Sequence, residues 1–283
     1  MQGLPFPIRR ISVMLGLIAL VLPMLSGPTW AARRIDLQPS MTPVKHQGSR
    51  NTCSVFAATS LMEYLLKQDS GREVDLSEAY NYWAGKRDAM KQSHLRAKYE
   101  NMDGLAGFLA VEAYQSGSML ESAWPYEPKN WQQTNDTRCK TVQGKPDTRC
   151  FTGVPPKSRR LRYGLSPVYV PRNRIGRFML KEKKPVVMNV LWFAEAVNNR
   201  NGRVRMPTEE EMQRARTTSS GHVITLVGYD ANKKEFTFRN SYGPGWGTNG
   251  YGTIPERYII EACEVCPFLQ RLDRFPPNEK DFV

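Results

Sequence analysis

The chain has 283 residues and carries 40 lysines and arginines against 27 acidic residues, a formal net charge of +13. This length allows one large domain or two lobes that share a core. A hydrophobic content of 40% with 24% charged residues is that of a folded protein and excludes a disordered chain, and no repeat or low-complexity tract is present.

Residues 1–31 are typical of a signal peptide. Two arginines precede an apolar run at 11–25, and small residues follow it as far as Ala31. We therefore expect cleavage after Ala31 and export to the periplasm or out of the cell. An uncleaved membrane anchor is the alternative, although the run is short for a membrane span and contains Pro23.

The five cysteines differ in their surroundings. Cys53 leads a helical pattern, and the other four lie in loop-like sequence: Cys139, Cys150, Cys263 and Cys266. An oxidising compartment permits disulfides, and an odd count leaves at least one thiol unpaired. We expect these four to form disulfides and Cys53 to be free. Cys139–Cys150 and Cys263–Cys266 are the simplest pairs among three connectivities, and a zinc site is the rival interpretation.

The first half of the chain has helical patterns. Residues 53–67 place apolar side chains on one wide face without interruption by Pro or Gly, and Thr52 is suited to cap this helix. A second helix is predicted to begin at Ser77, with the acid Glu78 in its first turn. A third is predicted within 105–117, where a glycine ends the pattern.

The middle of the chain is basic and looks irregular from 127 to 172. Within residues 138–184, only Asp147 and Glu182 oppose a long series of lysines and arginines. Such a stretch can attract anionic surfaces, but no aromatic residues are interleaved in the manner of a nucleic-acid motif. We interpret it as a solvated face, with weak attraction to anionic surfaces as the alternative and no specific nucleic-acid partner.

Strand-like patterns dominate the second half. They are rich in β-branched and aromatic residues and lie at 183–193, 222–230 and 234–240. Helices followed by strands predict an α+β fold, with a functional site in the cleft between the two halves. The expected parts of a domain at 32–283 are a helical lobe at about 45–130, a basic connecting region at about 131–175, a β lobe at about 176–262 and a tail at 263–283.

Cys53, His222 and Asn240 can together form a nucleophilic site. A thiolate nucleophile needs a base, and the base needs a third group that fixes its orientation. His222 opens a predicted strand, and a turn near Asn232 reverses the chain. Antiparallel pairing then places His222 across from residues near 240–242, so that the amide oxygen of Asn240 can accept a hydrogen bond from the imidazole of His222.

The start of the first helix favours a reactive Cys53. The helix dipole and unpaired N–H groups stabilise a thiolate there, and an imidazolium adds to the effect. Gln47 lies six residues upstream. Its side-chain amide and the backbone N–H of Cys53 are two candidate donors for a developing oxyanion.

Four segments resemble papain-family cysteine proteases. They occur in the order of that family within residues 43–254: QGSRNTCSVFA, WPYEP, GHVITLVGYD and FRNSYGPGWGTNGYGTI. The resemblance implies a two-lobed fold, with an N-terminal helical lobe and a C-terminal lobe of antiparallel sheet or barrel. It implies a Cys53–His222 ion pair, Asn240 as the orienting residue and Gln47 in the oxyanion hole. It also implies peptide-bond hydrolysis through a thioester acyl-enzyme, without a metal or an organic cofactor.

The sequence departs from the family pattern close to Cys53. Three residues before the nucleophile, the family has a cysteine bonded to the helical lobe, and here that position is Arg50. Ser54 replaces a tryptophan after the nucleophile, and Tyr242 replaces a tryptophan that shields the His–Asn hydrogen bond. Because fewer than twenty residues separate the signal from the nucleophile segment, we expect the usual long inhibitory propeptide to be missing, as in a secreted bacterial member.

The sequence also leads to expectations about the substrate pocket and the partners. The glycine-rich pocket segment of the family is only faintly matched around Gly104 and Gly107, and these residues with Phe108 are the candidate substrate contacts. A protein or peptide substrate, a protein inhibitor and a monomeric state are expected. Two alternatives stay open: a cysteine amidase or acyltransferase acting on a non-protein or cell-wall amide, and a non-catalytic binding protein of the same fold.

Overall fold

The computed structural model describes residues 33–100, 102–129, 141–142, 145–146, 149–158, 160–161, 164–218, 221–261 and 268–274. The expected signal peptide lies outside these residues. Each expected disulfide includes at least one cysteine outside them, so both pairings stay predictions. Among the described residues Cys53 is a free thiol. None of the helices in this part of the chain combines the length and apolar character needed to cross a membrane.

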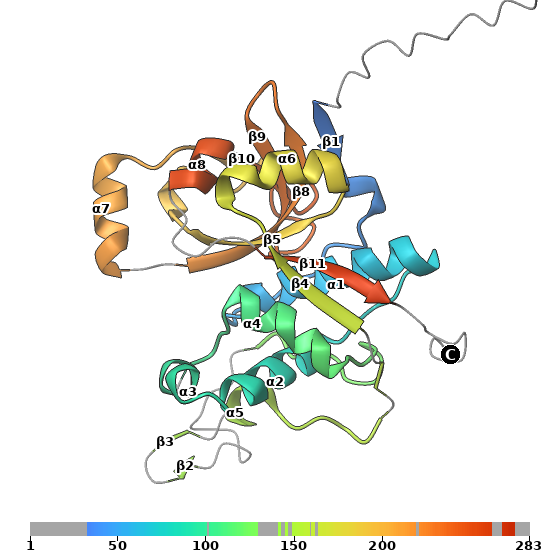
Figure 1. The fold of residues 1–283 in the computed structure, drawn as a ribbon. Coiled ribbons are helices and arrows are strands. Elements are labelled where there is room, and N and C mark those ends of the chain that lie inside the picture. The colour runs from blue at the N-terminus through green and yellow to red at the C-terminus, as the bar shows by residue number, and fades with distance from the viewer. Residues whose placement is uncertain are drawn as a thin grey trace, which may run out of the picture. The chain divides into compact units, whose positions relative to one another are not determined.

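Helix α1, Cys53–Ser70, lies at the centre of the molecule (Figure 1). Every residue from 54 to 66 is buried, because α1 packs on strand β8 on one side and on helices α2 and α4 on the other. The predicted helix is confirmed, and it ends at Gly71, whose φ of 70° closes the last turn. Thr52 occupies the N-cap position as predicted, but its hydroxyl makes no capping bond and instead bonds with the hydroxyl of Tyr126 at 2.5 Å.

Helices α2 and α4 pack against α1, and the short helices α3 and α5 contact α2 (Figure 1). Helix α2, Glu78–Ala89, begins as predicted, and the Ser77 hydroxyl caps it by accepting a bond from the Tyr80 N–H. The predicted third helix is a short α-helix, α4, followed directly by a 3-10 turn, η2. The bounds of the elements here are α3 Ser93–Tyr99, α4 Gly107–Glu112, η2 Ala113–Ser116 and α5 Arg149–Thr152.

In the part of the chain that the structure describes, nine strands form one sheet in the order β4-β11-β5-β8-β9-β10-β7-β6, with β1 also paired to β8. The three predicted strands are confirmed as β5 Val186–Leu191, β8 Gly221–Asp230 and β9 Glu235–Arg239. The others are β1 Arg34–Asp36, β4 Gly164–Tyr169, β6 Val197–Asn198, β7 Arg203–Val204, β10 Tyr251–Pro255 and β11 Phe268–Arg274. Since β7 and β10 pair in parallel, the sheet is mixed and not purely antiparallel as expected.

Two strands lie where the sequence predicted no regular structure. Strand β4 falls within the expected connecting region, and β11 falls within the expected tail. They pair with each other, and β11 also pairs with β5 at Phe268 and Val187. Each strand is therefore defined by a partner about a hundred residues away, which local sequence patterns do not reveal.

Within the described residues, two large apolar cores lie on the two sides of this arrangement, and a small third one joins α2 to η2 at Tyr80 and Ala113. The first joins α1, α2 and α4 to the inner side chains of β5 and β8, and the second joins the sheet to helices α6 and α8. This division agrees with a papain-like fold of two lobes. The remaining elements are η1 Gln38–Ser40, β2 Thr141–Val142, β3 Lys145–Pro146, η3 Arg172–Arg174, α6 Ile175–Glu182, η4 Ala194–Ala196, α7 Glu209–Thr218 and α8 Glu256–Glu261.

Candidate active site

The packing of α1 along β8 brings Cys53 beside Val223, the residue that follows His222. Cys53 is the first residue of α1, and His222 is the second residue of β8. The hydroxyls of Ser60 and Thr225 bond at 2.9 Å and join the helix to the strand. The backbone N–H of Val223, the residue after His222, faces the Cys53 thiol. The helix and the strand thus place the expected nucleophile next to the start of the strand that carries the expected base.

The expected hydrogen bond between His222 and Asn240 is present. The Nε2 atom of His222 lies 2.8 Å from Oδ1 of Asn240, and both side chains are buried. The same oxygen accepts the N–H of Ser241 at 2.8 Å, which fixes the amide so that its oxygen faces the imidazole. An amide oxygen only accepts, so Nε2 carries the proton and Nδ1 keeps its lone pair. That tautomer is the one a base needs.

Two aromatic rings cover the faces of the His222 imidazole. Tyr242 stacks on one face, with ring centroids 5.0 Å apart and an interplanar angle of 29°. Trp192 lies 4.6 Å from the imidazole centroid at 55°. Trp192 is partly exposed, packs against the second core and contacts the candidate base. The two rings contribute to the burial of His222, which is 4% exposed.

Burial opposes the isolated charges of both Cys53 and His222. It raises the pKa of the Cys53 thiol, although the N–H groups of Val223, Ser54 and Cys53 itself act in the opposite direction. It also lowers the pKa of His222 to about 4, against the effect of the hydrogen bond with Asn240. Burial disfavours each charge on its own. A thiolate and an imidazolium therefore form here only together, because each stabilises the other.

Both the nitrogen and the oxygen of the Gln47 side-chain amide form hydrogen bonds. Its Nε2 donates to the carbonyl of Arg50 at 2.7 Å, and its Oε1 accepts the hydroxyl of Ser241 at 2.5 Å. The backbone N–H of Gln47 also donates to the carbonyl of Ser241 at 2.9 Å. A primary amide has two N–H bonds, so one N–H of Gln47 is left for a ligand after the bond to Arg50.

The candidate substrate contacts differ in position. Gly104 is buried with a φ of 138°, and a Cβ there would lie 3.2 Å from the carbonyl of Asn51 in the loop before Cys53. Gly107 is also buried, and a Cβ on it would lie 2.5 Å from Oδ1 of Asn189. Phe108 packs partly buried against the first core. Gly104 is thus next to the nucleophile loop, and Gly107 is at the junction of α4 with the sheet. Contact of Gly104, Gly107 and Phe108 with a substrate stays a prediction.

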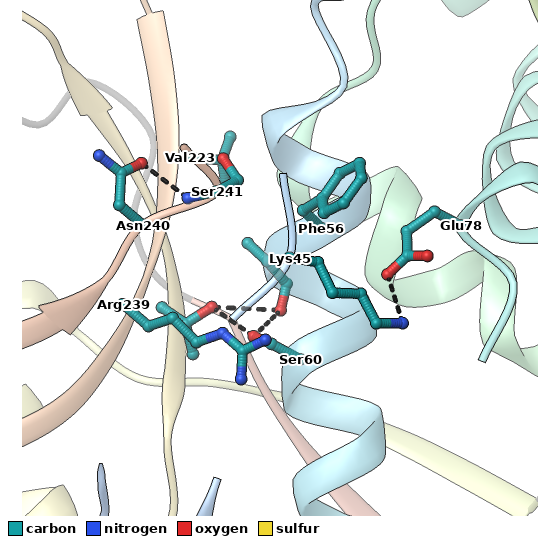
Figure 2. A pocket seen from close by; sticks show the side chains of 10 residues that line it. Lys45, Phe56, Ser60, Glu78, Val223, Arg239, Asn240 and Ser241 are labelled. Atoms are coloured by element: carbon teal, nitrogen blue, oxygen red, sulfur yellow. Dashed lines mark hydrogen bonds and ion pairs between the residues drawn. The ribbon is translucent and has the colours of Figure 1, made fainter. Parts of the chain in front are cut away.

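A small cavity lies directly behind the site (Figure 2). Its volume is about 10 Å³, the space that a single water molecule occupies, so it is no substrate pocket. Figure 2 shows Asn240 and Ser241 on its sheet side and Lys45 with Glu78 on its helical side. Within the described ranges, no group of three or more His, Cys, Asp or Glu side chains is arranged to hold a metal ion.

Some functional contacts were missed by the sequence reasoning. Ser241 holds Gln47, and Trp192 covers His222, but neither residue was assigned such a role. Ser241 directly follows Asn240 in a quoted segment, so its adjacency was a usable signal. Trp192 offered no such signal, because an aromatic residue at the end of a predicted strand usually packs in the core.

The comparison with protein families agrees with this geometry. The model of the papain family cysteine proteases matches residues 29–267, most of the chain. The chain therefore belongs to the papain family of cysteine proteases.

Particular relatives extend this result. Papaya proteinase 4 of Carica papaya is 29% identical over 223 residues, which cover 75% of this chain and 51% of the relative. The chain thus spans about half the length of this curated relative. Xylellain, a cysteine protease from Xylella fastidiosa, matches in structure with a TM-score of 0.66 at 19% identity, covering 86% of this chain and 87% of that one.

A second structural likeness is to the Carica candamarcensis cysteine protease CMS1MS2, solved in complex with E-64. Its TM-score is 0.56 at 19% identity, with 86% of this chain and 100% of that chain covered. At these identities the solved structures establish the papain-like fold.

Proposed function

We propose that this protein is a cysteine peptidase that hydrolyses peptide bonds through a thioester acyl-enzyme. The observation that carries the proposal is the hydrogen bond between His222 and Asn240, because it sets the tautomer that leaves Nδ1 of His222 able to take a proton from Cys53. Family membership supports the same chemistry. A protein or peptide is the proposed substrate.

The reaction begins with proton transfer from the Cys53 thiol to His222. The thiolate attacks the scissile carbonyl carbon, and the carbonyl oxygen becomes an oxyanion that the Gln47 amide and the Cys53 N–H stabilise. When the tetrahedral intermediate collapses, the C–N bond breaks and His222 gives its proton to the leaving amine. His222 then removes a proton from water, which attacks the thioester and releases the acid with regeneration of the thiol.

A thiol-directed epoxide tests the nucleophile. The related protease from Carica candamarcensis binds E-64, and we expect an epoxide of that class to add one equivalent to Cys53. The Cys53→Ala protein is expected to take up no label and to lose casein hydrolysis. Asn240→Ala is expected to keep the thiol but to lose most of the casein hydrolysis, because the imidazole is no longer held.

The same experiment separates the two alternatives. Labelling of Cys53 without hydrolysis of casein or short peptides indicates an amidase or acyltransferase acting on another amide. A well-folded protein that takes up no label overturns the nucleophilic role of Cys53 and favours a binding protein.

Export is the second part of the proposal. It rests on the basic and apolar pattern of residues 1–31 and on the small residues before position 32. N-terminal sequencing of the protein recovered outside the cytoplasm is expected to begin at Ala32. Recovery of a chain that still begins at Met1 contradicts the cleavage.

A further inference from the structure

Arg50 is a charged side chain that is almost completely buried beside the nucleophile. It has a relative exposure of 4% and lies in the loop between Gln47 and Cys53. Its guanidinium donates to Oδ1 of Asp103 at 3.3 Å and to the carbonyl of Glu127 at 3.2 Å. It also donates to the carbonyl of Phe151. One side chain therefore joins the nucleophile loop to three separate segments.

Two tyrosine rings enclose the same guanidinium. Its central carbon lies 5.2 Å from the ring centroid of Tyr82 and 5.5 Å from that of Tyr126. Tyr126 in turn donates its hydroxyl proton to the carbonyl of Gln47 at 2.8 Å. The hydroxyl of Tyr82 donates to Oδ1 of Asp103 at 2.7 Å. Both rings thus contact Arg50 with their faces and hold the surrounding loops with their hydroxyls.

Asp103 connects Arg50 to the expected pocket segment. Its other oxygen, Oδ2, accepts the backbone N–H of Asn51 at 3.2 Å. The backbone N–H of Gly104, the residue after Asp103, donates to the hydroxyl of Tyr82 at 2.8 Å. Gly104 is therefore also part of the hydrogen-bond network around Arg50. The position of Gly104 relative to Cys53 therefore depends on the contact between Arg50 and Asp103.

The backbone of Arg50 also holds the oxyanion donor. Its carbonyl accepts one N–H of the Gln47 amide at 2.7 Å, and this bond sets where the second N–H points. A shift of Arg50 therefore rotates the amide.

We propose that Arg50 is the positioning residue of the oxyanion hole. Its buried guanidinium fixes the loop from Gln47 to Cys53, and its carbonyl aims the Gln47 amide at the oxyanion. This inference rests on the proposed peptidase function. It also explains how the loop is held where the family places a cysteine bonded to the helical lobe. A planar cation with five donors can bond several carbonyls while it stacks on two rings, which an ammonium cannot do.

The test compares two reactions of the same thiol. Acylation by a peptide p-nitrophenyl ester passes through an oxyanion and needs the Gln47 amide. Alkylation by iodoacetamide forms an S–C bond as iodide leaves, and no oxyanion develops. In Arg50→Met we expect the acylation rate to fall about 100-fold, the size of effect seen when an oxyanion donor is lost. The alkylation rate is expected to stay within about threefold.

Two further variants keep the test decisive. In Arg50→Lys the charge remains but the fork and the stacking are lost, and we expect at least a tenfold fall in acylation. In Asp103→Asn the shape of the side chain remains and its charge is removed. We expect a smaller fall in the acylation rate than in Arg50→Met, again with the alkylation rate nearly unchanged. Arg87→Met is the matched control, because Arg87 also pairs with an acid, Asp88, and lies over an aromatic ring, but away from the site.

The possible outcomes separate the inference from the proposed function. Unchanged acylation in folded Arg50→Met or Arg50→Lys overturns the inference, and so does an equal fall in acylation and alkylation. If Arg50→Met does not fold, Arg50→Lys and Asp103→Asn decide between these results. A wild-type protein that iodoacetamide alkylates but no ester acylates contradicts the peptidase function itself, before any Arg50 variant is measured.

Discussion

At the scale of single residues, the environment of His222 decides how the candidate site ionises. The imidazole is buried, lies against the rings of Tyr242 and Trp192 and, among the described residues, is hydrogen-bonded to Asn240. Burial removes water that would stabilise an imidazolium, so the neutral imidazole is favoured, as the proposed transfer of the Cys53 proton requires. Tyr242 takes the part that the resemblance gives to a tryptophan, and Trp192 adds a second cover.

This environment predicts the titration of His222. In Cys53→Ala, we expect His222 to titrate near pH 4, because burial lowers its pKa to about 4. Adding Trp192→Ala lets water reach the ring, so the charged form is less disfavoured and the pKa rises towards the ordinary value of about 6.5. Proton NMR of the imidazole rings measures both values, since the chain has only three histidines.

A distant tryptophan provides the control for this titration. Trp83 packs against Tyr80 in the helical half, and Trp83→Ala is expected to leave the pKa of His222 unchanged. Equal pKa values with and without Trp192 would show that this ring does not exclude water from His222.

At the scale of elements, helix α6 packs on the sheet through a glycine. A Cβ at Gly176 would lie 2.5 Å from the ring of Tyr229 on β8, so the helix approaches the sheet as closely as the backbone allows. Ile175 and Met179 are buried on the same side of α6. This contact supports β8, the strand that carries His222.

We expect Gly176→Ala to destabilise the protein. Alanine favours a helix over glycine by about 1 kcal/mol, but overpacking a close contact costs about 1–3 kcal/mol. The expected net result is a free energy of unfolding lower by about 1 kcal/mol, measured by urea denaturation.

Another glycine tests whether packing is the cause. A Cβ at Gly245 would meet no atom within 4 Å, so Gly245→Ala is expected to change the free energy of unfolding by less than about 0.5 kcal/mol. A Gly176→Ala protein as stable as the wild type contradicts the close packing of α6.

At the scale of the whole molecule, a charge network around two buried acids and a partly buried lysine joins the halves of the chain. The ammonium of Lys45 bonds Glu63 of α1 at 2.8 Å and Glu78 of α2 at 3.0 Å. The guanidinium of Arg239, at the end of β9, donates to the carbonyl of Thr42 at 2.7 Å, just before Lys45. Burial opposes the charge of Lys45, but Glu78 and Glu63 outweigh it and raise the pKa of Lys45.

Removing the ammonium is expected to weaken the whole fold. Lys45→Met leaves Glu63 and Glu78 buried without their cation, and breaking a buried pair in this way costs about 3–5 kcal/mol. Urea denaturation measures the loss. Lys67→Met is the matched control: Lys67 pairs with Glu73 at 2.6 Å near the surface, and its loss is expected to cost less than about 1 kcal/mol. Equal losses in both proteins contradict a structural role for this charge network.

Local sequence patterns were enough to predict part of the fold and part of the candidate site. Strands β8 and β9 are adjacent in the chain, so hairpin geometry alone predicted the contact of His222 with Asn240. The partners of β4 and β11 lie far away in sequence, and no local pattern names them. The same holds for Arg50, whose burial depends on Asp103 and on two tyrosines from other segments.

The bonds between Gln47 and Ser241 determine when the protein can first act. These residues are 194 positions apart, so in a chain still being synthesised the Gln47 amide is not held by Ser241 until the last third has emerged. Contacts this distant along the chain form late in folding, because closing long loops costs entropy. On the proposed function, full peptidase activity therefore starts only with the final stage of folding.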